Sequence, residues 1–313
     1  MRYFSLFSGI GGFELGIQRA YVGITDGDKN GSREKDTERN DAGRQRLESK
    51  ERKRAHDALR RPVELLDWSD EPRAPRCVGY SEIDRFAIEI YEKHFTHKNY
   101  GDIREIDGAK LPRFDLLVGG FPCQSFSIAG KRKGFEDTRG TLFFEISRLL
   151  WARRPRIFLL ENVKGLTSHD NGRTFGIIIA SLDELGYDLE WQVLNSKHFG
   201  VPQNRERVYI IGHLRGTSRP EVFPLQADDL GYCGEPLPEP ETFGYVRNMS
   251  DIKSGRRHSV RIRRLTPVEC ERLQGFPDGW TEGVSDTQRY KTLGNAVTVN
   301  VIEHIVRKIL LSE

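Results

Sequence analysis

Short apolar runs recur along most of the chain, and each is followed by glycine or by a polar residue. Runs of this length predict buried strands, whereas several stretches between them repeat apolar residues at helical spacing. Strands that alternate with helices indicate an α/β domain with a mostly parallel sheet. The predicted strands are 3–7, 77–81, 116–118 and 156–160, the predicted helices include 141–152 and 173–186, and 191–194 with 208–212 form a closing antiparallel pair.

The segment 21–75 breaks this pattern. Residues 26–61 hold 12 Lys and Arg and 9 Asp and Glu among 36 residues, with almost no large apolar side chains. At roughly 1.5 kcal/mol of conformational entropy per ordered residue, such a segment buries too little to fold alone. We therefore predict a solvated, flexible insertion at 21–75, although its basic run 50–54 could also contact phosphates.

Residues 213–262 differ again, since they show no clear periodicity and contain five of the 14 prolines. Their end is basic, which suits either phosphate contacts or a solvated surface. Thr266 and Glu269 have the spacing of a capping box, with a proline after Thr266, so a helix begins there. A second helix with an apolar stripe reaches the C-terminus. We predict a large α/β unit from 1–212, a short separate region at 213–262 and a return to the large unit at 263–313.

Composition narrows the class of protein. No apolar run approaches the ~20 residues that span a bilayer, and no signal peptide opens the chain, so we expect a soluble intracellular protein. The four cysteines lie far apart without a Cys-x-x-Cys pair, which favours neither a zinc site nor disulfides. His94 and His97 lack a third ligand nearby in the sequence, so no metal site is predicted. The net charge of +3 is too small to indicate a nucleic-acid partner by itself.

A cysteine follows the third predicted strand on a tight turn. Gly119 and Gly120 end the strand, and Pro122 fixes the backbone just before Cys123. A thiol at the carboxyl end of a strand is placed where a substrate can reach it. The same residues suit an ordinary turn in which the cysteine is a small buried apolar side chain. The turn alone leaves both interpretations open.

Candidate ligand-binding residues follow the first two strands. Glycines 9, 11 and 12 would let the backbone approach a ligand, or they would simply form a tight turn before a helix. Glu82 ends the second strand, where nucleoside-binding α/β folds hold ribose hydroxyls, although a surface acid is the alternative. Asp84 is the predicted N-cap of the next helix, which has Phe86, Ile90 and Tyr91 on its apolar face.

Further candidate residues are charged or carry an amide. Glu161 and Asn162 end the fourth strand, and Arg205 and Arg207 lie two apart, hence on one side of an extended chain. The basic, glycine-bounded loop 129–134 suits either a lid over a polyanion or a plain exposed loop.

Six sequence blocks occur together in the order of the cytosine 5-methyltransferases that act on DNA, and the chain resembles this family. They cover most of residues 3–20, 76–212 and 263–311. The blocks are Phe7-Ser-Gly-Ile-Gly-Gly12, Gly119-Gly-Phe-Pro-Cys-Gln-Ser-Phe-Ser127, Glu161-Asn-Val163, Gln203-Asn-Arg-Glu-Arg207, Arg264-Leu-Thr-Pro-x-Glu-Cys270 and Gly294-Asn295.

The resemblance implies a Rossmann-like, S-adenosylmethionine-dependent methyltransferase fold with a mixed, mostly parallel sheet and a small irregular target-recognition domain at 213–262. It also implies that Cys123 adds to carbon 6 of a flipped-out cytosine, which prepares carbon 5 to receive a methyl group. Glu161 would bind ring nitrogen 3 and the exocyclic amine, and Arg207 the carbonyl oxygen. The other implied catalytic residues are Pro122, Gln124, Asn162 and Arg205.

By the same resemblance the methyl donor is S-adenosylmethionine. Glu82 would hold its ribose, and Asp102 with Ile103 would meet its adenine. Family members usually carry Asp at the position of Ser5, so one contact on this side differs. The implied cofactor-binding residues are Phe7, Ser8, Gly9, Ile10, Gly11, Gly12, Glu82, Ile83, Asp102, Ile103, Gly119, Pro122, Asn295, Ala296 and Val297.

The resemblance implies double-stranded DNA as the partner and no membrane. It also implies a protein of the bacterial or archaeal cytoplasm, or one encoded by a phage. A restriction enzyme or a specificity subunit could be a further partner. The region 213–262 is shorter than the recognition domains of most relatives, and either the unusual insertion at 21–75 or a partner subunit could compensate for it. The implied DNA contacts are Ser127, Lys131, Lys133, Arg139, Arg256 and Arg257.

Two other functions stay open. A related branch of the family methylates transfer RNA, but the Cys-Phe-Thr element of that branch is absent here. A non-catalytic, partner-dependent DNA-binding homologue is the second alternative, although every catalytic position is intact. Methyl transfer to DNA or to transfer RNA would separate the three.

Overall fold

The computed structural model describes residues 1–31, 74–122, 142–217, 221–225 and 264–312, with no side chains described for 26–31. In this part of the chain, no helix is long and apolar enough to cross a membrane. Some of the predicted site residues lie outside it. These are Cys123, Gln124, Ser127, Lys131, Lys133, Arg139, Arg256 and Arg257.

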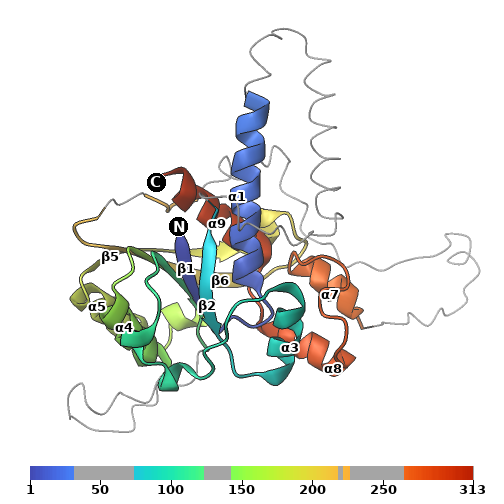
Figure 1. Cartoon of the computed structure of the whole chain (residues 1–313), viewed down its shortest axis with the longest axis horizontal. Coiled ribbons are helices and arrows are strands. Elements are labelled where there is room, and N and C mark those ends of the chain that lie inside the picture. Colours follow the sequence, from blue (N-terminus) through green and yellow to red (C-terminus); the bar gives the residue numbers. More distant parts are fainter. Residues whose placement is uncertain (32–73, 123–141, 218–220, 226–263, 313) are drawn as a thin grey trace, which may run out of the picture.

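A six-stranded mixed sheet with the order β2-β1-β3-β4-β6-β5 forms the centre of the fold (Figure 1). The first four strands in this order are parallel, β6 is antiparallel to β4, and β5 is antiparallel to β6. The predicted closing pair is therefore confirmed. The strands are β1 (Arg2–Leu6), β2 (Arg76–Ser81), β3 (Leu116–Gly120), β4 (Ile157–Val163), β5 (Tyr187–Asn195) and β6 (Glu206–Leu214).

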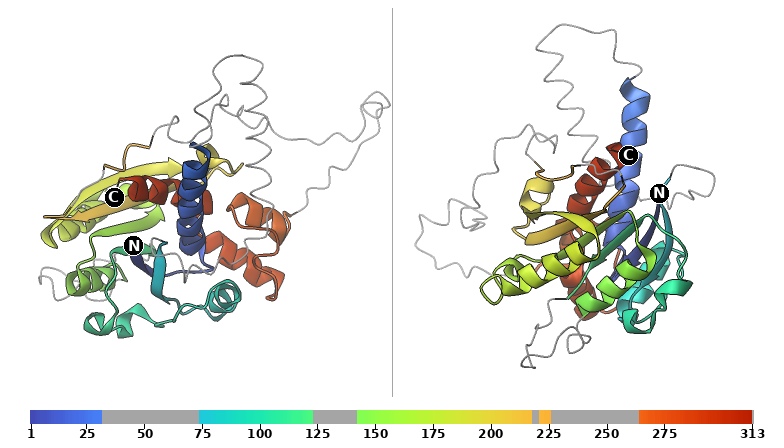
Figure 2. Two further views of the ribbon diagram at one scale, coloured as in Figure 1. Left: turned by 45° about the horizontal axis from the view of Figure 1, so that its top comes forward. Right: turned by 90° about the vertical axis from the view of Figure 1, so that its left-hand side faces the viewer.

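Helices cover both faces of the sheet, because successive strand residues point to opposite sides. Tyr3, Leu116 and Val118 pack with α1 (Gly12–Gly31) and α9 (Val299–Leu311), which lie side by side (Figure 2). Phe4, Leu6 and Leu117 pack with the opposite layer, α4 (Leu142–Arg153) and α5 (Arg173–Glu184). The near-continuous apolar strands predicted from the sequence are thus buried on both faces.

A third apolar cluster joins the two ends of the chain. It contains Ile10 and Leu15 from the N-terminal region and Phe276, Trp280 and Leu293 from the C-terminal region. The helices around it are α3 (Arg85–His94), α7 (Pro267–Leu273) and α8 (Asp286–Asn295), and single 3₁₀ turns lie at Ile103–Glu105, Gly108–Lys110, Lys164–Thr167 and Ser196–Phe199.

Helix termini follow the capping residues in the sequence. Asp84 caps α3 by accepting from the N–H groups of Phe86 and Ala87, and Thr266 with Glu269 forms the predicted capping box of α7. The predicted apolar face of α3 needs one correction. Ala87 is buried there with Ile90 and Tyr91, whereas Phe86 is only partly buried.

The start of the insertion also needs correction. Helix α1 continues to Gly31, well into the segment 21–75 that the polar composition assigned to the insertion. Tertiary packing supports the helix as far as Gly23, since α1 runs along α9. A side chain at Gly16 would collide with Ile302, and Gly23 lies against Arg307. Contact with α9 therefore extends the helix beyond the point where its own apolar pattern fades.

Candidate active site

A cleft of about 300 Å³ opens at the edge where the parallel strands end. Ligands of open α/β sheets bind at this edge. The first residues of β6 reach the same edge, because that strand runs antiparallel to β4. The cleft is lined by Phe7, Gly9, Glu82, Asp84, Ala87, Gly120, Phe121, Pro122, Glu161, Asn162, Val163, Arg205, Arg207, Thr292, Gly294 and Asn295.

A buried ion pair occupies one end of the cleft. The Oε1 atom of Glu161 lies 2.9 Å from Nε of Arg207, and the side chains are 10% and 19% exposed. Burial raises the pKa of the Glu161 carboxyl above its ordinary value, while the charges of Arg207 and Arg205 oppose that shift. A side chain on Gly120 would meet Oε2 of Glu161 at 3.1 Å, so the glycine leaves room for the carboxylate.

Arg205 connects this charged end to the C-terminal part of the chain. Its Nη2 donates to the carbonyls of Ala296 at 2.9 Å and Gly294 at 3.2 Å, on either side of Asn295. Burial lowers the pKa of its guanidinium, and the like charge of Arg207 adds to that effect. Both arginines line the cleft, and Arg205 acts on the backbone that carries Asn295.

Asn162 connects β4 to the turn that leads to Cys123. Its Nδ2 donates to the Phe121 carbonyl at 2.9 Å, and its Oδ1 accepts from the Val163 N–H at 2.8 Å. The side chain is buried, so both polar ends of the amide need these partners. The amide therefore fixes Phe121, two residues before the cysteine.

The other end of the cleft is built from backbone groups around Glu82. Its Oε2 accepts from the Gly9 N–H at 2.9 Å, and its Oε1 accepts from the N–H groups of Ile83 and Asp84, both at 2.8 Å. The predicted acid at the end of β2 thus meets the predicted glycine-rich turn. Phe7 and Gly9 of that turn have positive φ values of 52° and 55°, a conformation that costs a non-glycine residue strain.

The glycines of the turn have different surroundings. Open space surrounds the position of a side chain on Gly9. On Gly11 a side chain would collide with Phe95, and on Gly12 it would meet Val297 at 2.8 Å. Gly11 and Gly12 are therefore required by packing inside the protein, and only Gly9 of the three lines the cleft.

Several predicted cofactor residues lie behind or beside the cleft. Ile10 and Ile103 are buried in apolar clusters, and Ile83 is 66% exposed. Asp102 caps a 3₁₀ turn and pairs with Arg104. Ser5 is buried and its Oγ accepts from Ser8 Oγ at 2.9 Å. The predicted cofactor residues that do not line the cleft are Ser8, Ile10, Gly11, Gly12, Ile83, Asp102, Ile103, Gly119, Ala296 and Val297.

Two residues that the sequence did not single out brace the cleft. Gln274 is buried, its Nε2 donates to the Leu293 carbonyl, and its Oε1 accepts from Thr298 Oγ1, so it holds both sides of the loop at Asn295. Lys291 on α8 pairs with Asp84 at 2.7 Å. A buried glutamine after an apolar helix is a weak sequence signal, because its partners lie elsewhere in the chain.

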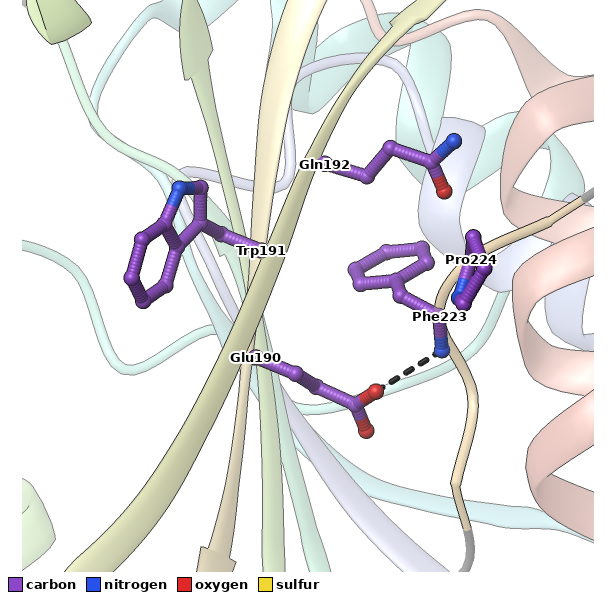
Figure 3. Close-up of a pocket in the computed structure, with 5 residues that line it drawn as sticks. All are labelled: Glu190, Trp191, Gln192, Phe223 and Pro224. Atoms are coloured by element: carbon purple, nitrogen blue, oxygen red, sulfur yellow. Dashed lines mark hydrogen bonds between the residues drawn. The ribbon is translucent and has the colours of Figure 1, made fainter.

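A shallower pocket of about 350 Å³ lies against the edge strand β5 (Figure 3). Glu190 accepts from the N–H groups of Val222 and Phe223, and Gln192 accepts from the N–H of Leu225. Trp191 points to the other side of the strand. These bonds attach the segment 221–225 to the sheet, so the pocket reflects a structural attachment.

The two histidines with metal-like spacing have other contacts. His94 stacks on Trp280, and Nδ1 of His97 lies 2.8 Å from the Tyr91 hydroxyl. Over the described ranges, no group of three or more His, Cys, Asp or Glu side chains could hold a metal ion.

Comparison with known proteins adds an independent line of evidence. The family model of the C-5 cytosine-specific DNA methylases matches residues 71–232 and 238–311. The chain is 42% identical over 280 residues to the Type II methyltransferase M1.ScrFI of Lactococcus lactis subsp. cremoris, covering 75% of this chain and 72% of the relative. It is 39% identical over 275 residues to the Type II methyltransferase M.NlaX of Neisseria lactamica, covering 74% and 88%.

A solved structure shares the fold. The crystal structure of the S. pombe Dnmt2 methyltransferase superposes with a TM-score of 0.63 at 18% identity, covering 99% of this chain and 98% of that chain. At this identity the similarity concerns the fold alone. The predicted Rossmann-like methyltransferase fold with a mixed, mostly parallel sheet is therefore confirmed.

Proposed function

Because the chain belongs to the C-5 cytosine-specific DNA methylase family, we propose that it transfers a methyl group from S-adenosylmethionine to carbon 5 of a flipped-out cytosine in DNA, through an adduct of Cys123 at carbon 6. The observation that carries the proposal is the buried carboxyl of Glu161 beside two arginines, at the edge where β3 leads into Pro122 and Cys123. A substrate in the cleft would therefore lie beside an acid, and the proposal is that the thiol of the residue following Pro122 reaches it.

Glu161 would supply the proton that activates the base. A cytosine ring becomes electrophilic at carbon 6 when its nitrogen 3 is protonated or strongly hydrogen-bonded. The raised pKa of Glu161 favours the protonated carboxyl that such a bond requires. Addition of the thiolate at carbon 6 then gives an enamine whose carbon 5 is nucleophilic. Once carbon 5 has received the methyl group, water would take the proton from carbon 5, and expulsion of the Cys123 thiolate would release the methylated base.

Arg207 would bind the carbonyl oxygen of the base. Its guanidinium is on the same side of the cleft as Glu161, so one base edge could meet both groups. Arg205 would keep Asn295 in place through its two bonds to the backbone. The arginines also compensate charge that develops on the ring, which is most effective in a site from which water is excluded.

Asn162 would position the nucleophile. An ordinary thiol has a pKa of ~8.5, so only a few per cent is thiolate at pH 7 and its placement matters as much as its ionisation. The bond from Asn162 to the Phe121 carbonyl holds the backbone just before Pro122 and Cys123. Gln124 lies in the same predicted turn and stays a predicted catalytic residue.

The residues at the other end of the cleft fit S-adenosylmethionine. Glu82 is an acid at the end of β2, where α/β folds bind ribose hydroxyls, and open space surrounds Gly9 beside it. When bound, the cofactor supplies an electrophilic methyl group. Phe7, Gly9, Glu82, Pro122 and Asn295 would contact it. Residues such as Gly11, Gly12 and Val297 would shape the turn from behind.

The proposed substrate is double-stranded DNA, whose target base must leave the helix to enter the cleft, at a cost of a few kcal/mol. The predicted DNA contacts at Ser127, Lys131, Lys133, Arg139, Arg256 and Arg257 remain predictions. A restriction enzyme or a specificity subunit stays a predicted partner, and two relatives are named Type II methyltransferases.

Methyl transfer from labelled S-adenosylmethionine tests the function. Wild-type protein and Cys123→Ala are each incubated with mixed double-stranded DNA or with transfer RNA, and the modified base is identified. We expect 5-methylcytosine in DNA with the wild type and none with the variant. Label in transfer RNA alone would contradict the proposal in favour of the RNA branch, and no label in either substrate would favour a partner-dependent homologue.

A further inference from the structure

Trp280 connects the C-terminal region to the glycine-rich turn at the other end of the chain. Its Nε1–H donates to the Ile10 carbonyl at 2.9 Å, and only 4% of the residue is exposed. Neither Trp280 nor Ile10 lines the cleft. The contact joins positions 270 residues apart in the sequence, so local sequence preferences do not explain it.

The turn that receives this bond has an unusual backbone. Positive φ values occur at Phe7, Gly9 and Gly11, so three of five consecutive residues adopt the left-handed region. Such a conformation costs energy at a residue other than glycine, such as Phe7, and persists only where the surroundings determine it. On the cleft side the turn is held by the bond from Gly9 to Glu82. On the opposite side the indole of Trp280 holds it.

Trp280 is itself firmly placed. Its ring stacks on His94 with centroids 3.6 Å apart and an angle of 8° between the planes. Its carbonyl accepts from Nε2 of His94 at 2.8 Å. The buried carboxylate of Glu271 accepts from the N–H groups of Gly279 and Thr281, the residues on either side. The ring of Trp280 and the backbone on both sides of it are therefore held by contacts other than the bond to the turn.

We propose that Trp280 is a positioning residue for cofactor binding, whose indole N–H fixes the Ile10 carbonyl and thereby sets the turn that carries Phe7 and Gly9 into the cleft. The inference rests on the proposed cofactor role of that turn. Because Trp280 does not touch the cleft, its effect is on the affinity for S-adenosylmethionine and not on the chemical step.

The substitution Trp280→Phe tests this, since phenylalanine keeps an aromatic ring against His94 and removes the N–H donor. We expect the Kd for S-adenosylmethionine, measured by calorimetry, to rise about three- to tenfold, which corresponds to one net hydrogen bond. The KM for the cofactor should rise equally, while kcat at saturating cofactor stays within about twofold. His94→Phe keeps an aromatic ring that can stack on Trp280 and removes the bond to the Trp280 carbonyl. It should raise the same Kd by a smaller factor.

Trp191→Phe is the matched control, because Trp191 is half exposed on β5 and contacts Phe175. It should leave the cofactor Kd unchanged. An unchanged Kd in Trp280→Phe, or an equal rise in the control, would overturn the inference. A wild type that binds S-adenosylmethionine but methylates no DNA would contradict the proposed reaction and leave this test intact. A wild type that binds none would overturn the inference together with the proposed cofactor.

Discussion

The two ends of the cleft are built in different ways. At one end Glu161, Arg205 and Arg207 bring buried charges together on β4 and on the chain entering β6. At the other end Glu82 and Gly9 form a network of backbone N–H groups around one carboxylate. The charged end depends on side chains that a rigid sheet presents. The backbone end depends on the shape of a turn, which distant residues such as Trp280 maintain.

This difference separates the two tasks that we propose. Chemistry on a base needs a proton donor and charge compensation where water is scarce, which the charged end provides. Binding a cofactor needs precise backbone placement, which the other end provides. Substitutions at the charged end should therefore lower kcat, and substitutions at the backbone end should weaken cofactor binding.

The largest effect is expected for Glu161→Gln. The amide is no proton donor of comparable acidity, and two partly buried arginines lose their counter-charge, so kcat should fall about 10²- to 10⁴-fold. Cofactor affinity should change little. Glu206→Gln is the control, since Glu206 pairs with Lys164 at the start of β6 but lies at the surface. A fall of less than about tenfold in kcat for Glu161→Gln would contradict the proposed role of Glu161 as general acid.

A smaller loss is expected for Asn162→Ala. The change leaves the Phe121 carbonyl without its amide partner, so the turn before Cys123 loses its fixed position. Misplacement by about 1 Å can cost 10²-fold in rate, and we expect kcat to fall about 10- to 100-fold. Asn204→Ala provides the comparison, since Asn204 is exposed and its Oδ1 accepts a hydrogen bond from Nδ2 of Asn195, away from the turn at Phe121. Equal activity of the two variants would show that Asn162 does not position the nucleophile.

At the backbone end, Glu82→Gln should separate affinity from rate. Glutamine has one acceptor oxygen, so it cannot serve both Gly9 and the N–H groups of Ile83 and Asp84. A hydrogen bond to a charged group contributes about 1.5–3 kcal/mol, so we expect the cofactor Kd to rise about 10- to 100-fold. Asp107→Asn, at an exposed cap, should leave the Kd unchanged. A fall in kcat without a change in Kd would contradict the division of the cleft.

The smallest effect concerns stability behind the glycine-rich turn. Burial raises the pKa of Glu14 from 4.5 to about 7, against the hydrogen bonds from Ser5 and Tyr91, which lower it. Since the native pKa is raised, Glu14 contributes stability that is complete below about pH 4.5 and is lost as the pH rises through 7. Glu14→Gln stays neutral and should not lose this contribution.

Thermal unfolding at several pH values measures that effect. Between pH 6 and pH 8 the wild type should lose about 1 kcal/mol relative to Glu14→Gln, or roughly 2–4 °C in Tm. Glu303→Gln on α9 serves as the control, since Glu303 pairs with Arg307 at the surface of the helix. Parallel Tm profiles of Glu14→Gln and wild type would show that Glu14 does not titrate in this range.

The charged end could be predicted from the sequence because its residues follow strands. Glu161 and Asn162 end β4, and the carboxyl ends of parallel strands meet at one edge, so their convergence with Pro122 follows from strand order. The spacing of the arginines placed them on one side of an extended segment, and the family resemblance assigned them to the site. The structure adds that Arg205 holds the backbone around Asn295.

The backbone end was predicted less completely. Three glycines suggested close approach to a ligand, yet Gly11 and Gly12 are required by contacts with Phe95 and Val297. Trp280 and Gln274 act through carbonyls and side chains far away in the sequence, and no local pattern encodes such pairs. The continuation of α1 past residue 21 was missed for the same reason, because the helix packs against α9 as far as Gly23.

Trapping the base adduct tests the central claim most directly. Duplex DNA carrying 5-fluorocytosine at the methylated position is incubated with the protein and S-adenosylmethionine, and the product is analysed by denaturing mass spectrometry. After methyl transfer the fluorine cannot leave carbon 5 as the proton would, so the adduct should persist, with the DNA and one methyl group attached at Cys123. Cys123→Ser should form no such complex. Methyl transfer to DNA without a covalent complex, or with methylation of the exocyclic amine, would contradict the account.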